Sequence, residues 1–64
     1  MPRRYSSTEL IKMVETAGWV LERVKGSHHH YHHPIKPGLV TITHPEKDMP
    51  QGTANKILKQ AGLK

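Results

Sequence analysis

The segment WVLERVKGSHHHYHH, residues 19–33, holds the pattern that decides the fold of this 64-residue chain. Residues 19–24 are β-branched, aromatic or long, and residues 28–33 form a second extended run. The short break between them, Lys25-Gly26-Ser27, contains the glycine that tight turns favour. The segment is therefore predicted to form a two-stranded antiparallel β-hairpin.

Side chains alternate between the two faces of a strand, so the hairpin sorts its residues into two sets. In the first run, one face is predicted to carry Val20, Glu22 and Val24, and the other Trp19, Leu21 and Arg23. In the second run, one face carries His28, His30 and His32, and the other carries His29, Tyr31 and His33. If Tyr31 packs in the core, the first three histidines point out from the open face of the sheet.

A helix is predicted on the N-terminal side of the hairpin. Ser6 stands three residues before Glu9, the spacing of a capping box, so Ser6 is the expected N-cap. Gly18 is expected to end this helix in a left-handed conformation. The apolar stripe of the helix consists of Leu10, Ile11, Met13, Val14 and Ala17.

A third strand and a second helix are predicted after the hairpin. The run LVTIT, residues 39–43, is rich in β-branched residues, and His44-Pro45 ends it. Pro50 suits the first turn of a helix over about residues 51–61, whose apolar side is Ala54, Ile57, Leu58 and Ala61. The predicted fold is α+β, in the order α-β-β-β-α, with two helices packed on one face of a three-stranded antiparallel sheet.

Length and charge narrow the range of functions. The chain is expected to form a single domain over residues 1–64, too small for a deep substrate cavity, because such a chain buries only about 60% of its unfolded surface. It has no cysteine for disulfides or thiolate zinc sites. Ten Lys and Arg against five Asp and Glu give a net charge of +5, which favours a polyanionic partner such as nucleic acid. The alternative is that the charge only keeps the protein soluble. Because no apolar run is long enough to cross a membrane, a soluble cytoplasmic protein with no membrane partner is expected.

Four interpretations of the histidine run remain open at this point. A remnant of an expression tag is disfavoured because tags are terminal and unbroken, whereas Tyr31 interrupts this run in mid-chain. Imidazoles at alternate strand positions can chelate zinc, copper or nickel, although no cysteine and no suitably spaced carboxylate accompanies them. The run can also be only a polar strand face. Finally, imidazoles on a basic protein can act as general acids and bases on a phosphodiester.

RNA is the natural substrate for such acid–base chemistry, because its 2′-hydroxyl is a built-in nucleophile. An imidazole that takes the hydroxyl proton, together with cations that stabilise the phosphorane, suffices for cleavage without a metal. The site can lie on a shallow surface, so a chain of 64 residues is long enough to carry it.

A series of short motifs runs through the chain. They are Gly18-Trp19, Arg23, Gly26-Ser27-His28, Tyr31, His33-Pro34, the Val-Thr-Ile strand, and Gly52-Thr53 ahead of ILKQAG, residues 57–62. In this order they cover nearly the whole chain, and the chain resembles the HicA family, toxins of type II toxin–antitoxin pairs. The resemblance implies a fold like that of double-stranded-RNA-binding domains and an endoribonuclease that cuts mRNA. It also implies a HicB-type antitoxin as partner.

The resemblance places the catalytic role on the histidine directly after Gly-Ser, which is His28 here, while His29 and His30 fall at positions that vary in the family. The expected RNA contacts are Arg23, Lys25, Gly26, Ser27 and His30. For Arg23, an ion pair with a helix carboxylate is the alternative. No metal or other cofactor is expected. The alternative function is a non-catalytic double-stranded-RNA-binding module.

Overall fold

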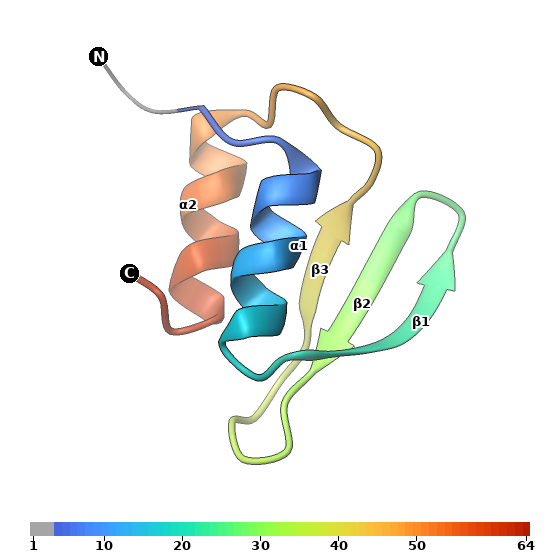
Figure 1. Cartoon of the computed structure of the whole chain (residues 1–64), viewed down its shortest axis with the longest axis vertical. Coiled ribbons are helices and arrows are strands. Elements are labelled where there is room, and N and C mark those ends of the chain that lie inside the picture. The colour runs from blue at the N-terminus through green and yellow to red at the C-terminus, as the bar shows by residue number, and fades with distance from the viewer. Residues whose placement is uncertain (1–3) are drawn as a thin grey trace.

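A computed structural model describes residues 4–64 of the chain (Figure 1). Helix α1 (Ser7–Thr16) is followed by strands β1 (Val20–Lys25), β2 (His28–His32) and β3 (Val40–Thr43) and by helix α2 (Gln51–Gln60). The strands form one antiparallel sheet in the order β1-β2-β3, and both helices lie on the same side of it. The predicted α+β class and element order are confirmed, whereas residues 1–3 of the predicted domain lie outside the described residues.

Ser6 caps α1 as predicted. Its Oγ accepts a hydrogen bond from the Glu9 N–H, and the Glu9 carboxylate accepts one from the Ser6 N–H, both 3.2 Å long. At the other end, Gly18 has a φ of +99°, in the left-handed region that glycine adopts without steric cost. The capping box and the glycine thus fix where α1 begins and ends.

The core lies between the helices and the sheet. Both helices pack against β3, and the Tyr31 ring on β2 extends the apolar layer beneath them. Trp19, just before β1, is buried and donates a hydrogen bond from Nε1 to the Ala61 carbonyl at the end of α2, at 3.2 Å. The apolar sides predicted for the helices face this layer, whose buried members are Leu10, Val14, Trp19, Tyr31, Val40, Ile42, Met49, Ala54, Ile57, Leu58 and Ala61.

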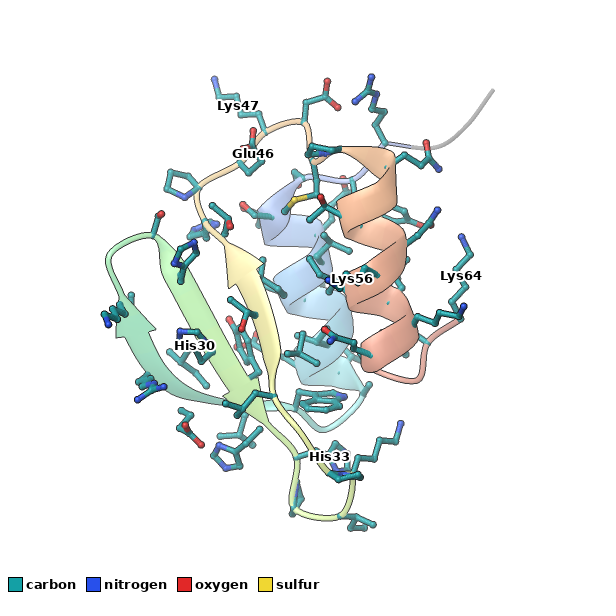
Figure 2. All side chains as sticks on the ribbon, turned by 180° about the vertical axis from the view of Figure 1, so that it is seen from behind. His30, His33, Glu46, Lys47, Lys56 and Lys64 are labelled. Carbon is teal, nitrogen blue, oxygen red and sulfur yellow. The ribbon has the colours of Figure 1, made fainter. Side chains whose placement is uncertain are left out.

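His33 (Figure 2) ties the end of β2 to the end of α1. Its Nδ1 accepts hydrogen bonds from the N–H groups of Ile35 and Lys36, at 3.0 and 3.1 Å. Its Nε2 lies 3.2 Å from the Ala17 carbonyl, so this nitrogen carries the proton and donates it. The ring also packs edge-on against Trp19, with the two centroids 5.3 Å apart. His33 therefore packs at the edge of the core and joins the two elements.

β1 departs from the predicted alternation at Glu22. The pairing of β1 with β2 steps directly from Leu21 to Arg23, so Glu22 is an extra residue that forms a β-bulge. A one-residue insertion moves every later residue of the strand to the opposite face. The prediction that Arg23 shares a face with Leu21, and Val24 a face with Val20, is therefore wrong.

All six residues of β1 are exposed, because the helices pack over β3 at the far side of the sheet.

Replacing Gly18 with alanine is expected to destabilise the protein more than the same change at Gly38. Both glycines have positive φ, +99° and +84°, so alanine is strained at either position, by about 1–2 kcal/mol. A Cβ on Gly18 would also lie 2.8 Å from Nε2 of His33, whereas a Cβ on Gly38 would meet nothing within 4 Å. Chemical denaturation gives the free energy of unfolding of each variant. Equal losses in the two variants would contradict the close approach of Gly18 to His33.

Alkaline pH is expected to destabilise the wild type through Tyr31. Burial of Tyr31, and secondarily the Glu15 carboxylate, raise the pKa of its hydroxyl above the usual 10.0. The folded state therefore favours the neutral hydroxyl, and this stabilisation is complete below pH 10.0 and is lost as the pH rises through the raised pKa. Above that pH, the free energy of unfolding of the wild type should fall more steeply than that of the Tyr31→Phe variant, which keeps the ring but cannot ionise. Parallel pH dependences would argue against the shift.

Candidate nucleic-acid interface

The face of the sheet that the helices leave open carries the predicted site residues. Tyr31 points to the core on the other face, so its neighbours in β2 point outward. Two neighbouring rows of residues paired across the three strands form the open-face site. One row consists of Lys25, His28 and Thr43, and the next consists of Arg23, His30 and Thr41. The prediction that His28 and His30 share the open face is confirmed by this register.

The β-bulge brings two cations into the open-face site. In a regular strand Arg23 would lie on the same face as Leu21, on the helix side of the sheet. The extra residue instead places Arg23 opposite His30 and Lys25 opposite His28. Directly paired residues have Cβ atoms about 4.5–5.5 Å apart, so each cation stands beside one imidazole. Within residues 4–64 Arg23 forms no ion pair with a helix carboxylate, because the helices lie on the other face.

Two imidazoles stand side by side along β2 in this site. The ring centroids of His28 and His30 are 6.5 Å apart, and the ring planes are inclined at 54°. His30, labelled in Figure 2, is half-buried. Its Nδ1 lies 2.9 Å from Oγ1 of Thr41 on β3. His28 is exposed to solvent. The site therefore combines one ring held by a hydrogen bond with one ring open to water.

The turn between β1 and β2 fixes the backbone of His28. Gly26 has a φ of +60°, whereas Ser27 has no positive φ, and this is the pattern of a two-residue type II′ turn. The Ser27 carbonyl accepts a hydrogen bond from the His44 N–H at 2.8 Å, which ties the turn to the end of β3. Among residues 4–64, only the chain neighbours of Gly26 approach within 4 Å of the place where a Cβ would stand. A ligand can therefore come close to the backbone beside His28.

The other histidines of the run do not join the open-face site. Nδ1 of His32 lies 3.5 Å from Oε1 of Glu22, an ion pair when the ring is protonated. His29 faces the helix side of the sheet, where its ring meets that of His44 edge-on with centroids 5.1 Å apart. His33 is held in the contacts with α1 described above. The run of imidazoles is thus divided among separate environments.

One buried polar contact on the helix side could not be predicted from the sequence. Ser7 is buried, and its Oγ accepts a hydrogen bond from the Glu46 N–H at 2.8 Å. Its Oγ also lies 2.7 Å from Nδ1 of His44, within hydrogen-bond distance. Ser7 and His44 are 37 residues apart in the chain, so no local sequence pattern predicts the contact. These contacts of Ser7 join the start of α1 to the loop after β3. The same loop is hydrogen-bonded, through the His44 N–H, to the turn between β1 and β2.

Residues 4–64 contain neither a metal-ligand cluster nor a membrane-spanning helix. Over this range no three side chains of the types His, Cys, Asp and Glu come together in a way that could hold a metal ion. The interpretation of the histidine run as a metal site therefore lacks a third protein ligand in this part of the chain. Neither α1 nor α2 is long and apolar enough to span a bilayer.

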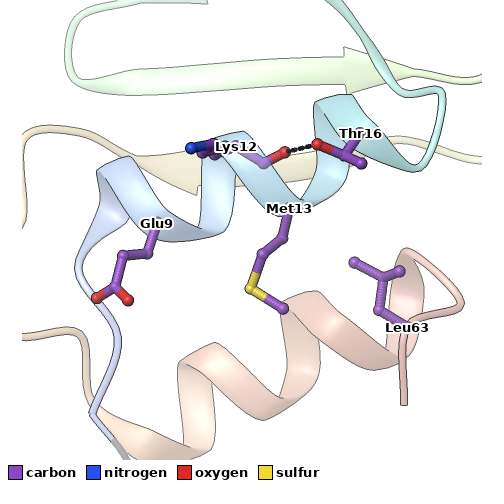
Figure 3. Close-up of a pocket in the computed structure, with 5 residues that line it drawn as sticks. All are labelled: Glu9, Lys12, Met13, Thr16 and Leu63. Atoms are coloured by element: carbon purple, nitrogen blue, oxygen red, sulfur yellow. Dashed lines mark hydrogen bonds between the residues drawn. The ribbon is translucent and has the colours of Figure 1, made fainter.

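One groove of the molecule lies on the helix side of the sheet, and another borders the open-face site. A groove on the helix side, between α1 and the C-terminal segment, is lined by Glu9, Lys12, Met13, Thr16 and Leu63 (Figure 3). A second groove lies between β3 and α2 and includes Thr41 of the open-face site, together with Leu39, Thr53, Lys56, Ile57 and Gln60. This second groove brings the ammonium-bearing Lys56 to the border of the open-face site.

Comparison with known families agrees with this architecture. The family model described as the HicA toxin of bacterial toxin–antitoxin systems matches residues 7–63 of the 64-residue chain. The match runs from the first residue of α1 to beyond the end of α2 and includes every residue of the open-face site. No curated protein shows a significant match to the chain. Because the family model covers almost its whole length, the chain belongs to the HicA toxin family of bacterial toxin–antitoxin systems.

Proposed function

We propose that this toxin is an endoribonuclease that cuts mRNA without a metal cofactor, with His28 as its catalytic histidine. One observation carries the proposal: an exposed imidazole, His28, is paired across the sheet with the cation Lys25 on the open face of a protein with a net charge of +5. Because both helices pack on the other side, an RNA strand can lie along this face without entering a pocket. A polyanion is the partner that such a surface attracts.

The chemistry needs only groups that the open-face site holds. His28, with its ring in solvent, can take the proton of a ribose 2′-hydroxyl, which then attacks the neighbouring phosphorus. Negative charge grows on the phosphate oxygens as the attack proceeds. Arg23 and Lys25 lie beside the imidazoles and can stabilise that charge, Arg23 through two parallel N–H donors. The open backbone at Gly26 and Ser27 lets the sugar–phosphate chain approach this position.

The antitoxin that restrains the enzyme is proposed to be of the HicB type and to cover the open-face site. A cationic face directed away from the core offers the antitoxin the same surface as it offers RNA, so binding of one partner excludes the other. A cytoplasmic location is part of this proposal, because mRNA is the proposed substrate.

Substitution of His28 with alanine is expected to lower RNA cleavage by about 10²–10⁴-fold, the contribution typical of a general acid or base. The matched control is His32→Ala, which removes an imidazole from the same face of β2 but outside the open-face site. Cleavage of mRNA is followed on denaturing gels in EDTA, and circular dichroism checks that both variants are folded. Growth arrest on expression should be lost only with His28→Ala.

The same assay separates this proposal from its rivals. Full activity of folded His28→Ala protein would overturn the catalytic assignment. Retention of RNA by the wild type without cleavage would favour a non-catalytic double-stranded-RNA-binding module. Cleavage that is abolished by EDTA and returns only with added zinc or nickel would favour a metal site instead.

Substitution of Lys25 with glutamine is expected to weaken RNA binding and to reduce its salt dependence, because one phosphate contact is lost. For a single strand, the slope of log K against log salt should fall by about 0.7. The matched control is Lys12→Gln, which removes the same charge from an exposed position on α1, outside the open-face site. Binding is measured in the His28→Ala background by fluorescence anisotropy at several salt concentrations. An equal change of slope in both variants would mean that the open face has no special role in binding.

A further inference from the structure

We propose that His30 is the second catalytic residue, a general acid that protonates the leaving oxygen, and that Thr41 is the residue that positions it. The inference rests on the proposed RNA cleavage and adds a group that the family resemblance does not imply. What points to it is the pairing of His28 with a second imidazole on the same face of the same strand and the hydrogen bond that holds this second ring.

The separation of the two rings suits a phosphodiester between them. In the cleavage of RNA, the attacking 2′-oxygen and the leaving 5′-oxygen stand on opposite sides of the phosphorus. A base and an acid must each come within about 2.6–3.2 Å of one of these oxygens. The ring centroids are 6.5 Å apart and the ring planes are inclined at 54°, so the two imidazoles are close enough to act on opposite sides of one phosphate placed above β2.

The hydrogen bond to Thr41 fixes which nitrogen of His30 acts. Nδ1 lies 2.9 Å from Oγ1 of Thr41, and a hydroxyl oxygen can accept the Nδ1 proton. An imidazolium held in this way has its second proton on Nε2, and that proton is the one available for transfer. Within residues 4–64 the ring of His28 has no hydrogen-bond partner. The unprotonated nitrogen of a neutral His28 ring is thus open to receive a proton, which distinguishes the roles of the two rings.

The cross-strand pairing supplies each imidazole with its own cation. Lys25 stands opposite His28, and Arg23 stands opposite His30. A phosphate above this array of four groups contacts two cations on the β1 side and two imidazoles on the β2 side. The cations hold the phosphate and stabilise its growing charge, so the two rings need only exchange protons with the substrate.

The proton balance of the step is complete without another reactant. His28 takes the proton of the 2′-hydroxyl, and the 2′-oxygen forms a bond to phosphorus. The bond between phosphorus and the 5′-oxygen breaks, and Nε2 of His30 gives its proton to that oxygen. The products are a 2′,3′-cyclic phosphate and a 5′-hydroxyl end. One proton has moved from RNA to His28 and another from His30 to RNA, and solvent restores the starting states.

The other imidazoles are not placed for this second role. His32 pairs with Glu22, and His29 lies on the opposite face of the sheet against His44. His33 uses both ring nitrogens in backbone contacts. Of the histidines in the described part of the chain, His30 alone shares the open-face site with His28.

The test uses a leaving group that needs no acid. An oligonucleotide with the linkage that the wild type cuts is made in two forms, one with the natural 5′-oxygen and one with sulfur in its place, since a thiolate leaves without protonation. With the natural linkage, His30→Gln should cut about 10²–10⁴-fold more slowly than the wild type. With the sulfur linkage, His30→Gln should recover to within a few-fold of the wild type, whereas His28→Ala should remain slow. His32→Gln, the matched control, should behave as the wild type on both.

The outcomes separate this inference from the proposed function. If the wild type cuts RNA and His28→Ala does not, the proposed function stands, whatever His30 does. The assignment of His30 is then overturned by a folded His30→Gln variant that cuts the natural linkage at the wild-type rate, or by a loss that the sulfur linkage fails to relieve. Rescue of His28→Ala by sulfur would reverse the two roles and also overturn it. If the wild type cuts no RNA at all, the proposed function itself fails.

Thr41 is tested as a positioning residue by removing and restoring its hydroxyl. Thr41→Val keeps the shape of the side chain and should lower kcat on the natural linkage with little change in KM. Thr41→Ser restores the hydroxyl and should restore kcat. The sulfur linkage should relieve the defect of Thr41→Val, because the acid is then unnecessary. A defect of equal size on both linkages would show that Thr41 acts on the structure alone and would refute its role through His30.

Discussion

The Tyr31 ring packs into the core under the helices, and this burial determines the direction of every other side chain in β2. With Tyr31 inside, strand alternation sends His30 outward on one side of it and His32 outward on the other. A shift of one residue would bury imidazoles and expose the ring, at the cost of an apolar contact and of unpaired polar atoms. The chemistry proposed for the open face therefore depends on a hydrophobic contact made on the opposite face.

Much of the fold follows from local patterns that the sequence displays. The Ser6 and Glu9 pair, the glycine turn of the hairpin and the apolar spacing of α2 each depend on neighbours within a few residues, and each agrees with the structure, except that Lys25 belongs to β1 and not to the turn. The predicted ends of the strands differ from the observed ones by only a residue, because the pairing that ends a strand also depends on its partner.

The parts of the site that escape prediction depend on contacts between distant segments. Regular alternation gives no reason to insert Glu22 as a bulge, yet that insertion puts Arg23 beside His30. The hydrogen bond between His30 and Thr41 joins two strands whose register the sequence alone does not set. The sequence does predict that His28 begins a strand after a glycine turn, since turn and strand are adjacent in the chain. The position of His28 is thus set by its neighbours in the chain, whereas the placement of Arg23 and Thr41 beside His30 depends on strand pairing.

The sheet is a single layer, with the stabilising core on one side and the open-face site on the other. Substitutions at exposed positions away from packed or capped groups usually change folding stability by no more than about 0.5 kcal/mol. Arg23, Lys25 and His28 are such exposed positions. Mutation can therefore alter what this face recognises while the protein stays folded throughout. Folding stability therefore constrains the residues of this face only weakly, and its sequence can vary one residue at a time without an unfolded intermediate.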